Sequence, residues 1–243
     1  MGKQYTAEEL TERWEAVREI ENLMGRRAFY TMLGENDKVW NEYWCSQALE
    51  PSLGVNEGYY RGCEALEQYY GALHDYITLQ TELAQKAYPD ALGSRDPEEI
   101  YNVGNLVCPS ISTPLIELAE DGQTAKGLWY VRGVDLGFGP SGPESWHFMG
   151  RLAADFIMED GAWKIWHLLY AEDLRSPTGR SWSTPAEEMP TDPRFAALAE
   201  FRFPAPNVPQ PLHELYHDRR PLKPFPRLPE PYTTFAETFS YGI

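Results

Sequence analysis

Residues 146–170 read WHFMGRLAADFIMEDGAWKIWHLLY, and this stretch decides the fold. Asp160-Gly161 lies near its centre, and an Asp-Gly pair between two apolar runs is a strong signal for a two-residue β-hairpin turn. The residues on either side are rich in aromatic and aliphatic types, which favour strands. The stretch therefore predicts two long antiparallel strands, over residues 146–158 and 162–170.

The turn also predicts which side chains of the hairpin share a face. With no irregularity, Asp155 would lie opposite Trp166, and Arg151 opposite Tyr170. Because side chains alternate along a strand, one face would mix aromatic and polar groups (His147, Met149, Arg151, Asp155, Lys164, Trp166 and Tyr170). The other face would be almost wholly apolar and would hold His167 among packing residues. The mixed face is the one expected to line a ligand pocket.

Helical patterns precede this hairpin in the chain. Thr6 to Glu9 fits a capping box, and apolar residues at helical spacing continue from there to about residue 33. Similar patterns predict a short helix over 38–45 and a long one over 63–87. Two more extended segments follow, and helices before an antiparallel meander predict an α+β fold.

The chain changes character after about residue 175. Most of its 20 prolines lie in this part, which shows little periodicity but retains many aromatic residues. We therefore expect two units, a domain over 1–175 and a Pro-rich arm over 176–243 that wraps the domain or a neighbouring subunit. The arm should be ordered and should bury aromatic residues such as Phe201, Phe225, Tyr232 and Phe235.

Charge excludes several classes of partner. The formal net charge is −16, and so acidic a chain repels nucleic acid and anionic membranes. The three cysteines have no metal-ligand or redox spacing. With no secretory leader and no long apolar stretch, the sequence predicts a cytoplasmic protein.

Five segments together resemble the nuclear transport factor 2-like, or SnoaL-like, superfamily. They are Gly161–His167 (GAWKIWH), IENLMGRR at 20–27, TPLIELAEDGQTAKG at 113–127, ADFIMEDG at 154–161 and PYTTF at 231–235. The resemblance covers roughly residues 8–175 and implies a cone in which three N-terminal helices pack on a curved antiparallel sheet. It is strongest to a bacterial subgroup that includes a diarylpropane lyase, with scytalone dehydratase and bile-acid dehydratase as more distant relatives.

The resemblance implies a cofactor-independent lyase or dehydratase acting on a small aromatic alcohol. A para-phenol can expel a benzylic hydroxide without metal, flavin or nicotinamide, and the subgroup's reaction continues with loss of formaldehyde from a lignin-derived diaryl compound. We find no dinucleotide-binding fingerprint and no P-loop. A non-catalytic binder with the same cone, and an isomerase of a polycyclic substrate, are the alternatives.

Eight residues form the predicted site. Tyr30, His147 and Asp155 would move protons, and Arg151 would hold a phenolate or other oxyanion. Substrate would be bound by Trp166, Tyr170, His74 and Met149. In the simpler interpretation, Asp155 and Arg151 form a structural ion pair, and the two histidines and Tyr30 are structural or solvated.

Two further predictions concern metal and assembly. His213-Glu214-Leu215-Tyr216-His217 matches the zinc motif H-E-x-x-H, but Pro211 and Pro221 bracket it and leave room for a short helix only. We therefore predict no metal site. We expect a homo-oligomer, a dimer or trimer.

Overall fold

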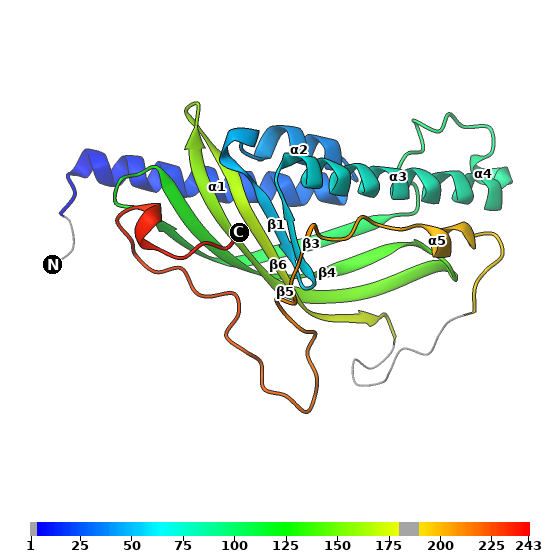
Figure 1. Cartoon of the computed structure of the whole chain (residues 1–243). Coiled ribbons are helices and arrows are strands. Elements are labelled where there is room, and N and C mark those ends of the chain that lie inside the picture. The colour runs from blue at the N-terminus through cyan, green and yellow to red at the C-terminus, as the bar shows by residue number, and fades with distance from the viewer. Residues whose placement is uncertain (1–3, 180–189) are drawn as a thin grey trace.

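The computed structural model describes residues 4–179 and 190–243, so residues 1–3 and 180–189 of the two predicted units lie outside the described part. In chain order, its helices and strands are α1 (Ala7–Met32), α2 (Asn36–Tyr43), a 3-10 turn (Gln47–Leu49), β1 (Ser52–Val55), β2 (Gly58–Arg61), α3 (Cys63–Ala87), α4 (Pro89–Leu92), β3 (Leu106–Leu118), β4 (Thr124–Gly139), β5 (Gly142–Glu159), β6 (Ala162–Pro177), α5 (Ala197–Glu200), β7 (Val208–Pro209) and a second 3-10 turn (Phe235–Glu237). Helices α1, α2 and α3 lie across a curved sheet (Figure 1). The predicted α+β fold is confirmed.

The first helix begins where its capping box predicts. The Thr6 side chain accepts a hydrogen bond from the backbone of Glu9, and the Glu9 side chain accepts one from the backbone of Thr6. Ile20, Leu23 and Met24 are buried, so the apolar side of α1 packs on the sheet as the helical spacing predicts.

The sheet has the order β3-β4-β5-β6-β1-β2-β7. All neighbours pair antiparallel except β1 and β6, which are parallel. Asp160 and Gly161 both have positive φ, at 50° and 78°, as the predicted hairpin turn between β5 and β6 requires. Met158 lies opposite Trp163, so the hairpin register next to the turn is also correct.

The two faces of the sheet have different coverings. The face toward the helices carries the main core, in which Leu152, Phe156 and Ile165 pack against α1, α2 and α3 residues such as Ile20 and Leu66. A second, smaller core lies on the other face, which we call the outer face. There Leu128, Ala153 and Leu169 are covered by residues from the C-terminal part of the chain, including Tyr241.

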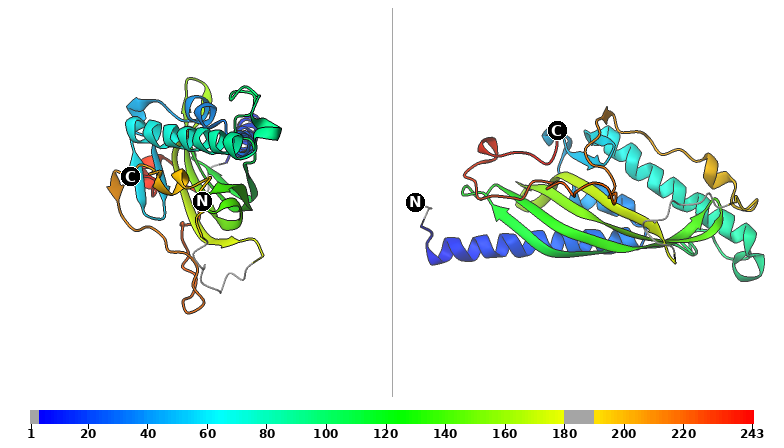
Figure 2. Two further views of the ribbon diagram at one scale, coloured as in Figure 1. Left: turned by 90° about the vertical axis from the view of Figure 1, so that its right-hand side faces the viewer. Right: turned by 90° about the horizontal axis from the view of Figure 1, so that it is seen from below.

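The C-terminal part is laid over the same chain in three stretches (Figure 2). Phe195 stacks on Phe138 with ring centroids 4.9 Å apart, β7 adds to the edge of the sheet beside β2, and the last residues cross the outer face. Tyr232 is buried as predicted, whereas Phe201, Phe225 and Phe235 are half-buried. No helix in residues 4–179 and 190–243 is long and apolar enough to cross a membrane.

Candidate ligand-binding site

A cavity of about 440 Å³ lies between the helices and the inner face of the sheet. This volume is in the range of pockets that bind small molecules. Most of its wall is apolar or aromatic: Leu53, Val55, Tyr69, Tyr70, Leu73, Tyr76, Ile77, Val107, Ile111, Val131, Leu136, Phe148 and Leu152. Such a wall fits an aromatic or other largely apolar ligand.

The C-terminal part completes one side of the cavity. Phe203 is among the lining residues. Its ring and that of Phe201 pack against Tyr76, with centroids 5.2 and 5.1 Å away, and the Tyr60 hydroxyl donates a hydrogen bond to the Pro204 carbonyl at 2.8 Å. The arm therefore contributes to the candidate site and also packs against the edge of the sheet.

One part of the cavity wall is polar, and its side chains are joined by hydrogen bonds. Tyr170 lines the cavity, and its hydroxyl donates a hydrogen bond to Glu172 Oε2 at 3.2 Å. Arg175, which also lines it, bonds Glu172 at 3.2 Å and Asp135 Oδ2 at 2.9 Å. Burial, followed by the Glu172 charge, raises the pKa of Tyr170, so its phenol is protonated at neutral pH. Burial opposes the charge of Arg175, but its two carboxylate partners outweigh that effect and raise its pKa.

Two other polar residues on the wall lack hydrogen-bond partners at buried atoms. Both amide atoms of Asn105 and the Nε of Arg27 have none in the described part of the chain. Buried polar atoms are nearly always bonded in folded proteins, and an exception calls for an explanation. Asn105 and Arg27 also line the cavity, but these particular atoms are enclosed by the protein and do not face the space in which a ligand would lie.

Only Tyr170 of the eight predicted site residues lies on this cavity wall. Tyr30 is half-buried, stacks on Tyr43 at 6.1 Å and lies under the Lys38 ammonium, while its neighbour Thr31 lines the cavity. His74 is exposed and stacks on Tyr101 at 5.3 Å. Tyr30 on α1 and His74 on α3 thus belong to the helices that cover the sheet, but neither residue lines the cavity.

The pairing of β5 with β6 shifts at two points, next to Asp155 and between Met149 and Gly150, and the shift next to Asp155 changes the predicted faces. A bulge at Trp166 places Asp155 opposite His167, and Arg151 opposite Ala171 instead of Tyr170. A bulge adds one unpaired residue and so reverses the facing of everything beyond it. His167 therefore joins Asp155 on the outer face, and Tyr170 turns to the inner face beside Leu152. The prediction that the mixed face lines the pocket is wrong.

Asp155 is completely buried beneath the C-terminal tail, residues 227–243. Its carboxylate accepts hydrogen bonds from Lys126 Nζ at 2.6 Å, the Ser240 hydroxyl at 3.0 Å and the Tyr241 amide at 2.8 Å, and lies 2.9 Å from His167 Nδ1. Burial lowers the pKa of Lys126, and the Asp155 charge opposes this. Four tail rings surround the ammonium, with centroids 4.5–5.7 Å away: Tyr232, Phe235, Phe239 and Tyr241. We call this cluster, made of Asp155, Lys126, His167, Ser240 and the four rings, the tail clamp.

The other outer-face residues also hold the arm or face solvent. Arg151 donates hydrogen bonds to the Asp173 carboxylate and to the Lys223 carbonyl, the latter at 3.2 Å. His213 Nε2 lies 2.8 Å from the same carboxylate. Trp166 donates to the Leu49 carbonyl and packs on Phe235 at 4.5 Å. His147 and Met149 are exposed. The ion pair of Arg151 is therefore with Asp173 rather than with Asp155.

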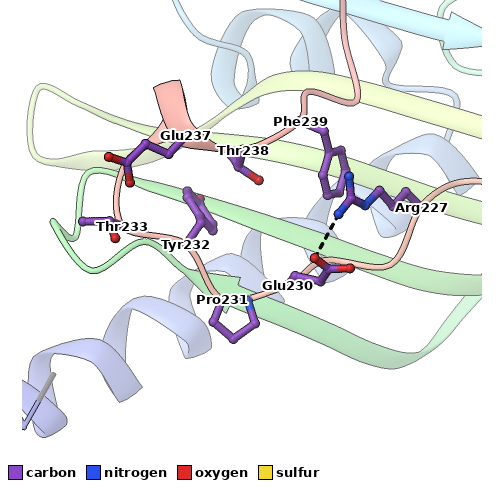
Figure 3. Close-up of a pocket in the computed structure, with 8 residues that line it drawn as sticks. All are labelled: Arg227, Glu230, Pro231, Tyr232, Thr233, Glu237, Thr238 and Phe239. Carbon is purple, nitrogen blue, oxygen red and sulfur yellow. Dashed lines mark hydrogen bonds and ion pairs between the residues drawn. The ribbon is translucent and has the colours of Figure 1, made fainter. Parts of the chain in front are cut away.

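A second hollow, of about 450 Å³, lies along the tail itself and is bordered by residues such as Arg227, Glu230, Tyr232 and Phe239 (Figure 3). Arg227 and Glu230 pair at 2.9 Å with both side chains exposed. Because this hollow is polar and made by one short segment, the inner cavity is the better candidate for an apolar ligand.

The H-E-x-x-H segment forms no helix. His213 is bonded to Asp173 and its ring stacks on Phe225 at 5.5 Å, while His217 is exposed. Within residues 4–179 and 190–243 no three His, Cys, Asp or Glu side chains are grouped to hold a metal ion. The two imidazoles do not form the ligand pair that the motif requires.

Reasoning from the sequence missed most of the actual wall. Asn105, Asp135 and Arg175 carry no motif, and Glu172 comes just after the predicted strand end. The available signal was the apolar face of the hairpin, because helices that cover a sheet need an apolar face beneath them. That face, with Leu152 and Phe148, is the one that borders the cavity.

Residues 12–168 match the model of the SnoaL-like domain family, and the chain belongs to this family. No curated protein matches the sequence.

Solved structures that resemble the chain share little sequence with it. The hexachlorocyclohexane dehydrochlorinase LinA-type3 from Novosphingobium barchaimii is 14% identical, with 72% of this chain and 99% of that chain covered and a TM-score of 0.47. A variant of Rv3472, a protein of unknown function from Mycobacterium tuberculosis, is 17% identical, with coverages of 79% and 89% and a TM-score of 0.46. A nuclear transport factor 2-like protein from Salmonella enterica is 14% identical, with coverages of 70% and 99% and a TM-score of 0.47. At these identities no activity is transferred to this chain.

Proposed function

We propose that the chain is a cofactor-independent dehydratase or related lyase that acts on a small aromatic alcohol bound in the inner cavity. The observation that carries the proposal is Tyr170, a residue that lines an otherwise largely apolar cavity and whose hydroxyl is bonded to the Glu172 carboxylate. A phenol linked to a carboxylate can relay a proton between a bound ligand and the base behind it.

The relay suits a substrate with a phenol para to a benzylic hydroxyl. The phenol proton passes to the Tyr170 oxygen while the Tyr170 proton passes to Glu172. Electrons from the resulting phenolate then break the benzylic C–O bond, and hydroxide leaves and takes up a proton from solvent to become water. The product is a quinone methide. It becomes a vinylphenol when a neighbouring carbon loses a proton to solvent and the ring oxygen regains a proton from Glu172 through Tyr170.

Cationic side chains on the wall would stabilise the phenolate. Arg27 and Arg175 both line the cavity. Preorganised donors aimed at developing charge are a large source of rate acceleration. Loss of formaldehyde from a diaryl substrate is the finer form of this proposal.

The test substrate is 1-(4-hydroxyphenyl)ethanol, whose dehydration yields 4-vinylphenol and water and is followed by absorbance. We expect turnover by the native chain. Tyr170→Phe keeps the ring and removes the relay, so kcat/KM should fall by about 10²–10⁴. Tyr130→Phe, at an exposed outer-face tyrosine, is the matched control and should leave the rate unchanged. Equal rates for native and Tyr170→Phe protein would contradict the relay.

A second function, non-catalytic binding, is favoured by a specific observation. The described residues that line the cavity include no histidine, although histidine is the commonest acid–base residue near neutral pH. Calorimetric binding of the same alcohol without conversion would assign the chain to this function. An isomerase would instead convert a polycyclic substrate with no loss of water.

A further inference from the structure

The inner cavity opens to solvent beside the arm. Of the residues that line it in the described part of the chain, only Phe203 and Arg175 are exposed. The exposed fraction is 44% for Phe203 and 37% for the Arg175 side chain. A residue that borders a cavity and also touches solvent lies at the opening of that cavity. The mouth of the cavity is therefore between Phe203 on the arm and Arg175 on β6.

We propose that the Phe203 ring controls passage through this mouth and is a specificity-determining residue, which admits narrow aromatic ligands and slows or excludes bulky ones. The inference rests on the part of the proposed function that places the ligand in the inner cavity. It is independent of the reaction that follows binding.

Arg175 forms the fixed side of the mouth. Its guanidinium bonds Asp135 Oδ2 at 2.9 Å and Glu172 Oε2 at 3.1 Å, and it lies 5.5 Å from the centre of the Phe148 ring. Hydrogen bonds between ionised partners are among the strongest that side chains make. The mouth therefore cannot widen on this side without breaking two ion pairs.

The backbone of the arm is also held on both sides of Phe203. Before it, Leu198 on α5 is buried. After it, the Tyr60 hydroxyl donates a hydrogen bond to the Pro204 carbonyl at 2.8 Å, and β7 pairs with β2. A proline restricts the residue before it to extended backbone, so Pro204 leaves Phe203 little backbone freedom. This stretch of the arm runs from α5 toward β2 (Figures 1 and 2).

The Phe203 ring is the part of the mouth that is free to move. It packs against the rings of Tyr76 and Phe201, with centroids 5.2 and 5.1 Å away, and its other side faces solvent. A side chain that is partly exposed changes rotamer within picoseconds to nanoseconds, whereas a bonded backbone segment moves more slowly. The size of this ring therefore sets the width through which a ligand passes.

Stopped-flow fluorescence on the full chain measures ligand entry. Trp40 and Trp44 both pack against Tyr70, which lines the cavity, so their emission reports a ligand that arrives there. The probes are two neutral phenols, the narrow 4-ethylphenol and the bulky 4-(1-adamantyl)phenol. With the native chain, 4-ethylphenol should associate faster.

Substitutions of Phe203 should change the ratio of the two association rate constants. Phe203→Ala should raise the rate constant of the bulky probe about tenfold, within the range over which association rates vary among variants of one interface. The rate constant of 4-ethylphenol should change much less. Phe203→Trp should slow the bulky probe further. Circular dichroism confirms folding, which is expected because the side chain is largely at the surface.

Two further variants separate the ring from its surroundings. Phe29→Ala removes an exposed ring that does not line the cavity, and it should leave both rate constants unchanged. Tyr60→Phe removes the hydrogen bond to the Pro204 carbonyl and keeps the Phe203 ring. Because it loosens only the backbone of the arm, the ratio of the rate constants should stay near its native value.

The same ratio in native and Phe203→Ala protein would overturn the proposal. So would an equal change of ratio in Tyr60→Phe, since the backbone of the arm would then control entry, or a native chain that does not bind 4-ethylphenol. Dehydration of 1-(4-hydroxyphenyl)ethanol is assayed separately. A chain that shows the Phe203 effect without turnover would refute the proposed reaction and leave the role of Phe203 in place.

Discussion

The inner and outer faces of the same sheet differ in the polar side chains that they carry and in how these are bonded. On the outer face, the buried charges of the tail clamp are bonded on several sides, with four polar groups around Asp155. Around the inner cavity, Asn105 in the loop before β3 and Arg27 on α1 have buried atoms without partners among the described residues, as does Ser52 beneath the tail on the outer face. The dense set of charged residues on the outer face therefore attaches the tail, whereas the candidate cavity on the inner face has a largely apolar wall.

The largest expected effect is on the outer face. Asp155→Asn leaves the Lys126 ammonium buried without its counter-charge, and breaking such a pair costs about 3–5 kcal/mol of unfolding free energy. Chemical denaturation measures this loss. Binding of an aromatic ligand at a temperature where the variant is folded should be nearly unchanged.

The matched variant is Lys126→Met/Asp155→Asn, which removes both charges and should recover much of the lost stability. If Asp155→Asn kept native stability but lost turnover, Asp155 would be catalytic and the comparison of the two faces would fail.

The next largest effect compares tryptophan substitutions at two adjacent residues of β4 that lie on opposite faces of the sheet. Val131 lines the cavity, and Tyr130 is 55% exposed on the outer face. Val131→Trp fills the cavity and should abolish ligand binding at a stability cost of about 1–3 kcal/mol. Tyr130→Trp should change neither quantity. Calorimetry with 1-(4-hydroxyphenyl)ethanol checks both, and a ligand that bound Val131→Trp as tightly as the native chain would exclude the inner cavity.

The smallest effect is a dependence of stability on alkaline pH. Burial, with Asp155 nearby, raises the pKa of Tyr241 above the usual value of 10.0. The folded chain therefore holds this proton more tightly than the unfolded chain. That contribution to stability is complete below about pH 10 and is lost as pH rises through the folded pKa. Denaturation at several alkaline pH values should show a shallower loss for Tyr241→Phe, and an unchanged loss for Tyr130→Phe.

The sequence predicts the parts of the fold that are decided locally. The capping box of Thr6, the helical spacing and the Asp160-Gly161 turn each depend on neighbours in the chain, and the structure confirms them. The site depends on a bulge at Trp166, and no residue type in the stretch announces one. Once Trp166 is left unpaired, His167 and Tyr170 exchange faces relative to Asp155.

The remaining part of the site comes from packing between distant segments. Phe203 reaches the cavity from a segment far along the chain, and Arg175 is held by Asp135 from another strand. Such contacts have no short-range signal. The arm also explains why polar residues of β5 can be buried on the outer face, since its tail supplies the hydrogen-bond partners that solvent would otherwise supply.

A crystal structure soaked with 1-(4-hydroxyphenyl)ethanol tests the central claim most directly. The aromatic ring is expected between the helices and the inner face of the sheet, against Val131 and Leu152, with its phenol oxygen within hydrogen-bond distance of Tyr170. Ligand bound on the outer face at Asp155, with the inner cavity empty, would contradict it.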